Sequence, residues 1–258
     1  MTVQQALGIG VADARLLLSE ATGFSQASLL ASPEKELPAE AEARFRDFAA
    51  RRKRGEPVAY IVGHKEFFSL DLTVNRAVLI PRPETELLVE LALERKPSSV
   101  LDLGTGSGAI ALAIKKHLPR TRVVAVEASA AALAVAQRNA VKCGLEVEFR
   151  HGQWLRAVDE PFDLIVSNPP YVAENDPHLA DLGFEPRSAL VSGADGLDAI
   201  REICRDARPH LKAGGWLLLE HGIGQDAAAR ALLERAGLES VTTWPDLAGI
   251  PRVSGGKA

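Results

Sequence analysis

The feature of this chain that most constrains its fold is an alternation of strand-like and helix-like segments that begins near Pro81. Runs rich in Val, Ile and Leu predict strands at 99–104, 122–128, 146–152, 162–168 and 215–221. Segments with helical periodicity separate them, at 107–117, 129–142, 195–212 and 224–236. Such alternation is typical of an α/β domain in which helices cover both faces of a mostly parallel sheet. Two weaker strands, 240–246 and 252–256, are expected to pair antiparallel at one edge and bring the sheet to seven strands.

The residues before this alternation follow a different pattern. Thr2 and Gln5 have the spacing of a capping box at a helix start, and 38–54 is a longer helical segment that ends at Gly55. Residues 66–80 alternate apolar and polar side chains, which predicts a β-hairpin. We therefore expect a small N-terminal helical-bundle domain, a β-hairpin linker and an α/β domain, with boundaries at 1–65, 66–80 and 81–258.

Composition excludes several classes of protein. The formal net charge of −4 disfavours binding of nucleic acid by phosphate neutralisation alone. The two cysteines form no CxxC pair and the six histidines show neither HxxxH nor HExxH spacing, so we expect no disulfide framework and no metal site. No segment reaches the roughly 20 apolar residues that cross a bilayer, and the N-terminus lacks the apolar core of a signal peptide. We expect a cytoplasmic protein that does not contact membranes.

A glycine-rich loop follows the first predicted strand of the α/β domain. In its sequence LDLGTGSG, residues 101–108, glycines let the backbone turn sharply and let a ligand approach the main chain. Glu127 ends the next strand, where an acid can accept both hydroxyls of a ribose or serve as a first-turn helix acid. No Gly-Lys-Ser/Thr sequence is present, which argues against a phosphate-binding nucleotide loop. The pattern favours an adenosine-containing cofactor over a tight turn without a ligand, and it leaves open which cofactor.

The sequence Asn168-Pro169-Pro170-Tyr171 directly follows the fourth predicted strand. Because ligands of open α/β sheets bind beyond the carboxyl ends of the strands, this tetrapeptide is expected to face the glycine-rich loop. The prolines fix the backbone, so the Asn168 side-chain oxygen and the Pro169 carbonyl can together accept both hydrogens of one –NH2 group. Tyr171 can offer a flat face to a planar substrate. A proline-rich turn without chemistry would not need this Asn and Tyr, and the arrangement favours a conjugated nitrogen, as in an amide or an exocyclic base amine.

Several longer segments resemble one known family. IPRPETE (80–86), DLGTGSGAIALA (102–113) and SNPPY (167–171) make the chain similar to the release factor glutamine methyltransferases, the HemK/PrmC family, over nearly its whole length. The resemblance implies a class I, Rossmann-like methyltransferase domain and a helical domain that docks the release factor. It also implies methyl transfer from S-adenosylmethionine to N5 of the glutamine in the Gly-Gly-Gln motif of class 1 peptide chain release factors. We expect the enzyme to be a monomer.

By motif position, the resemblance further implies roles for individual residues. The cofactor-binding residues would be Gly104, Thr105, Gly106, Ser107, Gly108, Glu127, Trp154 and Asn168. The glutamine site would be formed by Asn168, Pro169, Pro170 and Tyr171, of which Asn168, Pro169 and Tyr171 would be the catalytic residues. Two departures from the family matter: Glu127 stands where the family usually has Asp, and residues 1 to about 45 match in helical character but barely in sequence.

Two other functions stay open on the sequence. An adenine-N6 methyltransferase acting on DNA or RNA uses a similar Asn/Asp-Pro-Pro-Tyr arrangement, although it normally carries a basic surface and this chain is acidic. A non-catalytic nucleotide-binding module would use the sheet as a scaffold and would not need Asn168 to Tyr171. Turnover of the cofactor distinguishes that module from either methyltransferase.

Four further features are harder to assign. Residues 82–86 combine Pro with acids ahead of a helix, which fits ordinary capping and equally a place near the active site. Arg51 to Arg54 close a helix, where cations suit the dipole, and they are expected to face solvent. Glu185-Pro186-Arg187 is a candidate for the wall of a substrate channel. Cys143 and Cys204 are expected to be small apolar residues without chemistry.

Overall fold

The computed structural model describes all residues, 1–258. Its contacts divide the chain into two compact units, Met1–His64 and Lys65–Ala258, and each unit is described by itself. No helix combines the length and the apolar character that crossing a lipid bilayer requires.

The first unit is built from short helices: α1 (Val3–Leu7), α2 (Ala14–Thr22), α3 (Gln26–Ala31), α4 (Ala39–Lys53) and α5 (Val58–Val62). The predicted capping box is present, because the Thr2 hydroxyl accepts from the Gln5 backbone N–H and the Gln5 side chain accepts from that of Thr2. Phe45 of α4 is fully buried in a cluster with Leu17 and Leu18 of α2. This unit therefore has an apolar core of its own.

Arg51, near the end of α4, holds this unit together. Its Nε lies 2.9 Å from Oε2 of the buried Glu56, and its guanidinium donates to the carbonyls of Tyr60 and Ile61 at 3.0 and 3.3 Å. The solvent-facing interpretation of this basic segment is therefore wrong for Arg51. The four consecutive cations at the end of α4 do not reveal that the chain from Glu56 to Ile61 folds back to contact Arg51.

Next along the chain is a two-stranded sheet of β1 (His64–Phe67) and β2 (Leu70–Thr73). The predicted strand pattern of 66–80 ends earlier than expected. The reason is a turn at Asn75, whose side chain accepts from the Ala77 backbone N–H at 2.9 Å and whose carbonyl accepts from that of Val78 at 3.1 Å.

The large sheet of the second unit has seven strands in the order β5-β4-β3-β6-β7-β9-β8. The strands are β3 (Ser99–Leu103), β4 (Arg122–Glu127), β5 (Glu148–His151), β6 (Phe162–Ser167), β7 (Leu211–Glu220), β8 (Glu239–Pro245) and β9 (Pro251–Lys257). The first five in the order are parallel, whereas β9 pairs antiparallel with both β7 and β8. The predicted mostly parallel, seven-stranded sheet with an antiparallel edge is confirmed.

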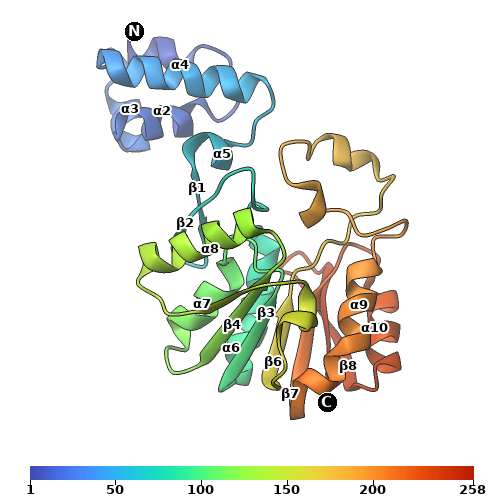
Figure 1. The fold of residues 1–258 in the computed structure, drawn as a ribbon. Coiled ribbons are helices and arrows are strands. Elements are labelled where there is room, and N and C mark those ends of the chain that lie inside the picture. Colours follow the sequence, from blue (N-terminus) through green and yellow to red (C-terminus); the bar gives the residue numbers. More distant parts are fainter. The chain divides into compact units, whose positions relative to one another are not determined.

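Helices cover both faces of this sheet (Figure 1). The helices are α6 (Glu86–Arg95), α7 (Ala109–His117), α8 (Ala130–Cys143), α9 (Asp198–Ala207) and α10 (Asp226–Arg235). The first three contribute to one buried apolar cluster and the last two to another. Neighbouring strand residues point into different clusters, as with Val100 in the first and Leu101 in the second, because side chains alternate along a strand. The sheet therefore lies between two apolar layers.

The helix predicted over 195–212 is shorter in the structure. It begins only after Gly196, which has a φ of 78°. It gives way to a 3₁₀ turn, Arg208–His210, at Pro209, whose ring nitrogen cannot donate a helical hydrogen bond. The remaining residues, from Leu211, extend the following strand backwards.

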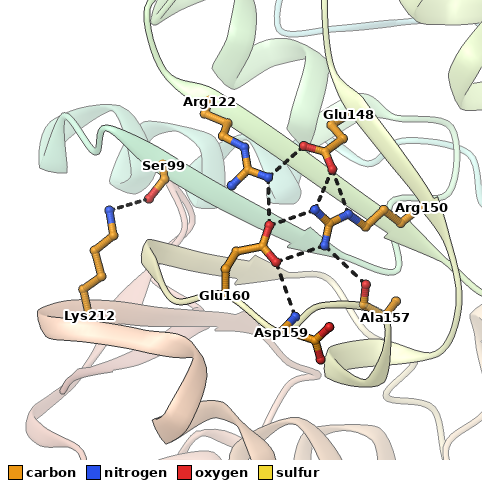
Figure 2. A network of polar contacts seen from close by, with 8 residues as sticks. All are labelled: Ser99, Arg122, Glu148, Arg150, Ala157, Asp159, Glu160 and Lys212. Atoms are coloured by element: carbon orange, nitrogen blue, oxygen red, sulfur yellow. Dashed lines mark hydrogen bonds and ion pairs between the residues drawn. The ribbon is translucent and has the colours of Figure 1, made fainter.

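A cluster of ion pairs joins β4 to β5 near the first residue of β4 (Figure 2). Arg122 lies 2.8 Å from both Glu148 and Glu160, and Arg150 contacts the same two carboxylates at 2.5 and 2.8 Å. Hydrogen bonds from Arg150 and Arg122 hold the pKa of the Glu160 carboxyl well below its usual range. The cluster therefore links the edge strand β5 to β4 and to Glu160, which precedes β6.

Candidate active site

A cavity of about 410 Å³ opens beyond the carboxyl ends of β3, β4 and β6. This volume is within the range of small-molecule sites, about 300–1,000 Å³. Of the residues predicted from the sequence, the cavity is lined by Gly104, Thr105, Gly106, Ser107, Glu127, Trp154, Asn168 and Pro170. Gly108, Pro169 and Tyr171 do not line it. The structure thus brings the glycine-rich loop and the Asn-Pro-Pro-Tyr turn to one space, as expected from the sheet topology.

Two glycines of the loop are needed for different reasons. Gly106 has a φ of 58°, and a Cβ placed on it would meet no atom within 4 Å. The main chain at this point is open to the cavity. At Gly108, with a φ of 85°, a Cβ would lie 3.1 Å from Leu112 Cδ1 and 3.3 Å from Ala136 Cβ. Gly108 therefore allows close packing of α7 against α8, which explains why it lies outside the cavity wall.

Glu127 connects the loop to the next helix. Its Oε2 accepts from the Gly106 backbone N–H and its Oε1 from that of Ser129, each at 2.9 Å. A carboxylate has about four lone-pair sites, so each oxygen can still accept a further hydrogen bond. Glu127 is also part of the cavity wall. The sequence suggested two roles for Glu127, binding a ribose and capping the first turn of the next helix. The structure allows both at once.

Asp102 was given no role by the sequence pattern, yet it supports the loop from beneath. It is fully buried, and its Oδ2 accepts from the Thr105 hydroxyl at 2.6 Å. Burial raises the pKa of the Asp102 carboxyl to about 7. In the sequence, the only sign of this supporting role was an acid two residues before the first glycine of the loop.

Trp154 begins a 3₁₀ turn, Trp154–Ala157, with the unusual φ of 49°. Its ring is so close to the loop that a Cβ on Gly104 would lie 3.1 Å from Trp154 Cζ3. The ring also lines the cavity. A bulky residue in the left-handed region is uncommon, and here the indole ring reaches both the loop and the cavity.

Asn168 follows the last residue of β6, and one hydrogen bond fixes its side chain. Its Nδ2 donates to the Thr85 hydroxyl at 3.0 Å. Because the amide nitrogen is engaged, the amide oxygen Oδ1 is the atom left to accept from a ligand. Thr85 is itself buried and lines the cavity.

Tyr171 lies outside the lining of the cavity and is held by two hydrogen bonds. Its hydroxyl donates to Oε1 of Glu220 at 3.2 Å, and its backbone carbonyl accepts from Gln225 Nε2 at 3.0 Å. Burial raises the pKa of the Tyr171 phenol above its usual range. The nearby His221 has both ring nitrogens engaged, Nδ1 with the Gly222 carbonyl and Nε2 with the Ser254 hydroxyl. It is therefore not free to act as a base.

Glu185 is buried and joins two segments that border the cavity. It accepts from the backbone N–H of Ile80 at 3.0 Å and from the guanidinium of Arg82. The next residue, Pro186, lines the cavity together with Ser188. Glu185 thus ties the segment before α6 to the loop that follows the Asn-Pro-Pro-Tyr turn.

Comparison with known proteins relates this geometry to a family. The family model described as the PrmC N-terminal domain matches residues 4–63, and the one described as the methyltransferase small domain matches residues 83–182. A release factor glutamine methyltransferase from Xylella fastidiosa is 51% identical over 253 residues, which cover 95% of this chain and 92% of that protein. The chain belongs to the release factor glutamine methyltransferase family. A relative of the same name from Neisseria gonorrhoeae is 45% identical and covers 100% of this chain and 98% of its own length.

Solved structures with low sequence identity confirm the methyltransferase fold of this family member. A methyltransferase from Pyrococcus furiosus has a TM-score of 0.60 at 20% identity, covering 85% of this chain and 98% of its own. The 16S rRNA N2 G1207 methyltransferase of Thermus thermophilus, solved with AdoMet and guanosine, has a TM-score of 0.56 at 22% identity, covering 75% and 49%. The predicted Rossmann-like methyltransferase fold is therefore correct.

Proposed function

We propose that this chain transfers a methyl group from S-adenosylmethionine to N5 of the glutamine in the Gly-Gly-Gln motif of class 1 peptide chain release factors. Membership of the family and the names of its relatives support the substrate. The observation that carries the chemistry is the single orientation of Asn168, whose Nδ2 is bound to Thr85 and whose Oδ1 remains available to an amide N–H. If the Asn168 amide were turned over, its –NH2 group would face the –NH2 group of the substrate, and two donors cannot form a hydrogen bond.

The donor would occupy the cavity beside the glycine-rich loop. The open main chain at Gly106 would admit it, Glu127 would accept from its ribose hydroxyls, and Trp154 would pack on its adenine. When bound, S-adenosylmethionine supplies an electrophilic methyl group on a sulfonium centre. The protein is left with the task of orienting a poor nucleophile, an effect with a ceiling of about 7–11 kcal/mol.

The glutamine amide would be oriented by two acceptors. Asn168 Oδ1 and the Pro169 carbonyl would each accept one of its two N–H hydrogens. These acceptors would favour the nitrogen as it becomes tetrahedral and positively charged, which is the electrostatic logic of an oxyanion hole with the sign reversed. Tyr171 would pack around the substrate side chain from its mostly buried position beside Glu220. No side chain is required to remove a proton before methyl transfer, because the cationic methylated amide loses its proton readily.

The same two acceptors would also fit an exocyclic adenine amine, so the substrate class needs a direct test. The purified protein is incubated with S-adenosylmethionine and a class 1 release factor, and the factor is digested and analysed by mass spectrometry. We expect the mass of one added methyl group on the Gly-Gly-Gln peptide, and none when that glutamine is replaced by glutamate. Methylation of an adenine-containing oligonucleotide, with an unmodified release factor, would instead support the nucleic-acid alternative.

A further inference from the structure

A line of buried side chains leads away from Asn168 and ends at a carboxyl group that the proposed function does not use. Thr85, 4% exposed, accepts from Asn168 Nδ2. Glu220 at the end of β7 is 1% exposed, and its Oε1 accepts from the Tyr171 hydroxyl. Its second oxygen, Oε2, is buried and has no hydrogen-bond partner. The Thr85 hydroxyl neighbours the same carboxyl group, which therefore borders the hydroxyls of both Thr85 and Tyr171.

The ionisation of Glu220 depends on its surroundings. Burial raises the pKa of its carboxyl to about 7, whereas the neighbouring Thr85 and Tyr171 hydroxyls and the charge of Arg252 lower that pKa, and the charge of Glu84 raises it. Arg252 is itself paired with Asp246, at 3.1 Å between Nε and Oδ2. Near neutral pH the carboxyl therefore populates both of its protonation states. A buried carboxyl without a full set of partners is costly and calls for an explanation.

The Thr85 hydroxyl is the ambiguous member of this line, because a hydroxyl can donate or accept. If it donated to Asn168, the Asn amide would have to turn over, and the cavity would then face its –NH2 group. That group cannot accept from a substrate amide. An ionised carboxylate behind Thr85 removes the ambiguity, because it can only accept, so the hydroxyl proton is directed to it.

We propose that Glu220 is a positioning residue, which takes the Thr85 hydroxyl proton, makes Thr85 an acceptor for Asn168 Nδ2, and thereby holds Asn168 Oδ1 toward the substrate amide. Its other oxygen holds the Tyr171 hydroxyl. Glu220 does not touch the substrate and acts through Thr85. The inference rests on the proposed function, since it explains how the acceptor used there is kept in one orientation.

The test compares substitutions along the line in the full-length protein, with the release factor as substrate. Thr85→Val keeps the shape and removes the hydroxyl, and we expect kcat to fall roughly 10- to 100-fold, on the scale of losing one preorganised group. The KM for the release factor and the calorimetric affinity for S-adenosylmethionine should stay close to the wild-type values. Thr85→Ser restores the hydroxyl and should recover most of the rate.

Glu220→Gln provides the second arm. Its –NH2 group can donate to the Thr85 hydroxyl, which would then donate to Asn168 and turn the Asn168 amide over. We expect kcat at pH 8 to fall to the Thr85→Val level. The wild-type rate should decline as the pH falls through about 7, and this step should disappear in Glu220→Gln. The double variant should be no slower than either single variant, because both break the same line. Glu239→Gln, an exposed change on β8, is the matched control and should leave rate and pH profile unaltered.

Three results would overturn the inference: a wild-type kcat in a folded Thr85→Val variant, additive effects in the double variant, or a pH step that persists in Glu220→Gln. Circular dichroism shows whether Glu220→Gln folds. If it does not, the rates of Thr85→Val and Thr85→Ser still test whether the hydroxyl at position 85 orients Asn168. A purely structural role of Glu220 toward Tyr171 would change KM for the release factor and leave Thr85→Val fully active. Failure of the wild-type protein to methylate the release factor would contradict the proposed function instead.

Discussion

At the residue scale, Gly106 is the position where the backbone and the proposed donor meet. A Cβ there would find no protein atom within 4 Å, so the side chain of Gly106→Val would enter the cavity, with backbone strain from the φ of 58°. We expect the affinity for S-adenosylmethionine to fall at least ~10-fold, because the ligand can no longer approach the main chain. Isothermal titration calorimetry measures this directly.

The control for that variant is Gly144→Val. Gly144 has a φ of 65° and open space around its Cβ, but it ends α8 and does not line the cavity. The Gly144→Val substitution therefore imposes a similar backbone strain and does not block the ligand. A folded Gly106→Val protein that binds the donor as tightly as the Gly144→Val protein would show that the donor is not where we place it.

A second residue-scale prediction concerns the buried carboxyl of Glu220. Because burial raises its pKa from 4.5 to about 7 in the folded state, the folded protein binds more protons than the unfolded chain between these pH values. Stability attributable to this group is therefore present at low pH and is lost as the pH rises from about 4.5 to 7. Relative to Glu220→Gln, the wild-type protein should lose free energy of unfolding over that window. Urea denaturation at several pH values tests this, and parallel curves for the two proteins would be inconsistent with a raised pKa.

The residues of the site differ in how far the sequence reveals them. The loop glycines, Glu127 and Asn168 follow strand ends in recognisable motifs, and strand ends meet at one edge of a parallel sheet. Thr85 and Glu220 are remote from each other in the sequence, and only the fold brings Thr85 beside Asn168 and Glu220 beside Tyr171. Tyr171 belongs to the motif, but its side chain points to Glu220 and not into the cavity, which a motif cannot show. An acid that ends a strand neighbouring the Asn-Pro-Pro-Tyr strand was the only available signal for Glu220.

At the scale of elements, the ion-pair cluster between β4 and β5 supports the edge of the sheet. Arg150→Gln removes its contacts with Glu148 and Glu160. These side chains are partly exposed, so we expect a loss of about 1 kcal/mol or less in unfolding free energy, which should shrink in high salt. Arg205→Gln, at an exposed pair on α9, should have a smaller effect.

The pH dependence of this cluster has the opposite sign to that of Glu220. Hydrogen bonds from Arg150 and Arg122 lower the folded-state pKa of Glu160 below its ordinary value of 4.5. The stabilisation is therefore fully present above pH 4.5 and is lost as the pH falls below it. The difference in unfolding free energy between wild type and Arg150→Gln should shrink in that acidic range. A difference that grows on acidification would contradict this account of the cluster.

Elements were predictable where one local pattern dominates. The β-branched strands and their parallel pairing follow from alternation with helices, whereas the order of the strands in the sheet does not. The ends of α9 depend on Gly196 and Pro209, whose local effects override the helical periodicity over 195–212. The cluster of Figure 2 joins Arg122 to Glu160, and no sequence spacing identifies such a pair.

At the scale of the whole molecule, the second unit has its own apolar clusters, and every residue lining the cavity lies between Ala77 and Ala189. A fragment that begins near Glu66 should therefore bind S-adenosylmethionine if it is soluble. We expect it to lose most of its activity on an intact release factor, because the helical unit is proposed to dock that substrate. Calorimetry and a methyl-transfer assay on the same preparation separate the two properties. Full activity of the fragment on the intact factor would remove the docking role from residues 1–65.

The central claim is that Asn168 orients the substrate amide, and single-turnover kinetics tests it most directly. Wild type and Asn168→Ala, both saturated with S-adenosylmethionine, are mixed in excess over the release factor, and methylation of the Gly-Gly-Gln peptide is followed by quenched-flow mass spectrometry. We predict that Asn168→Ala is slower by ~10²-fold or more, on the scale of losing one preorganised group, while the protein stays folded. Methylation of the release factor by folded Asn168→Ala at the wild-type rate would contradict the account.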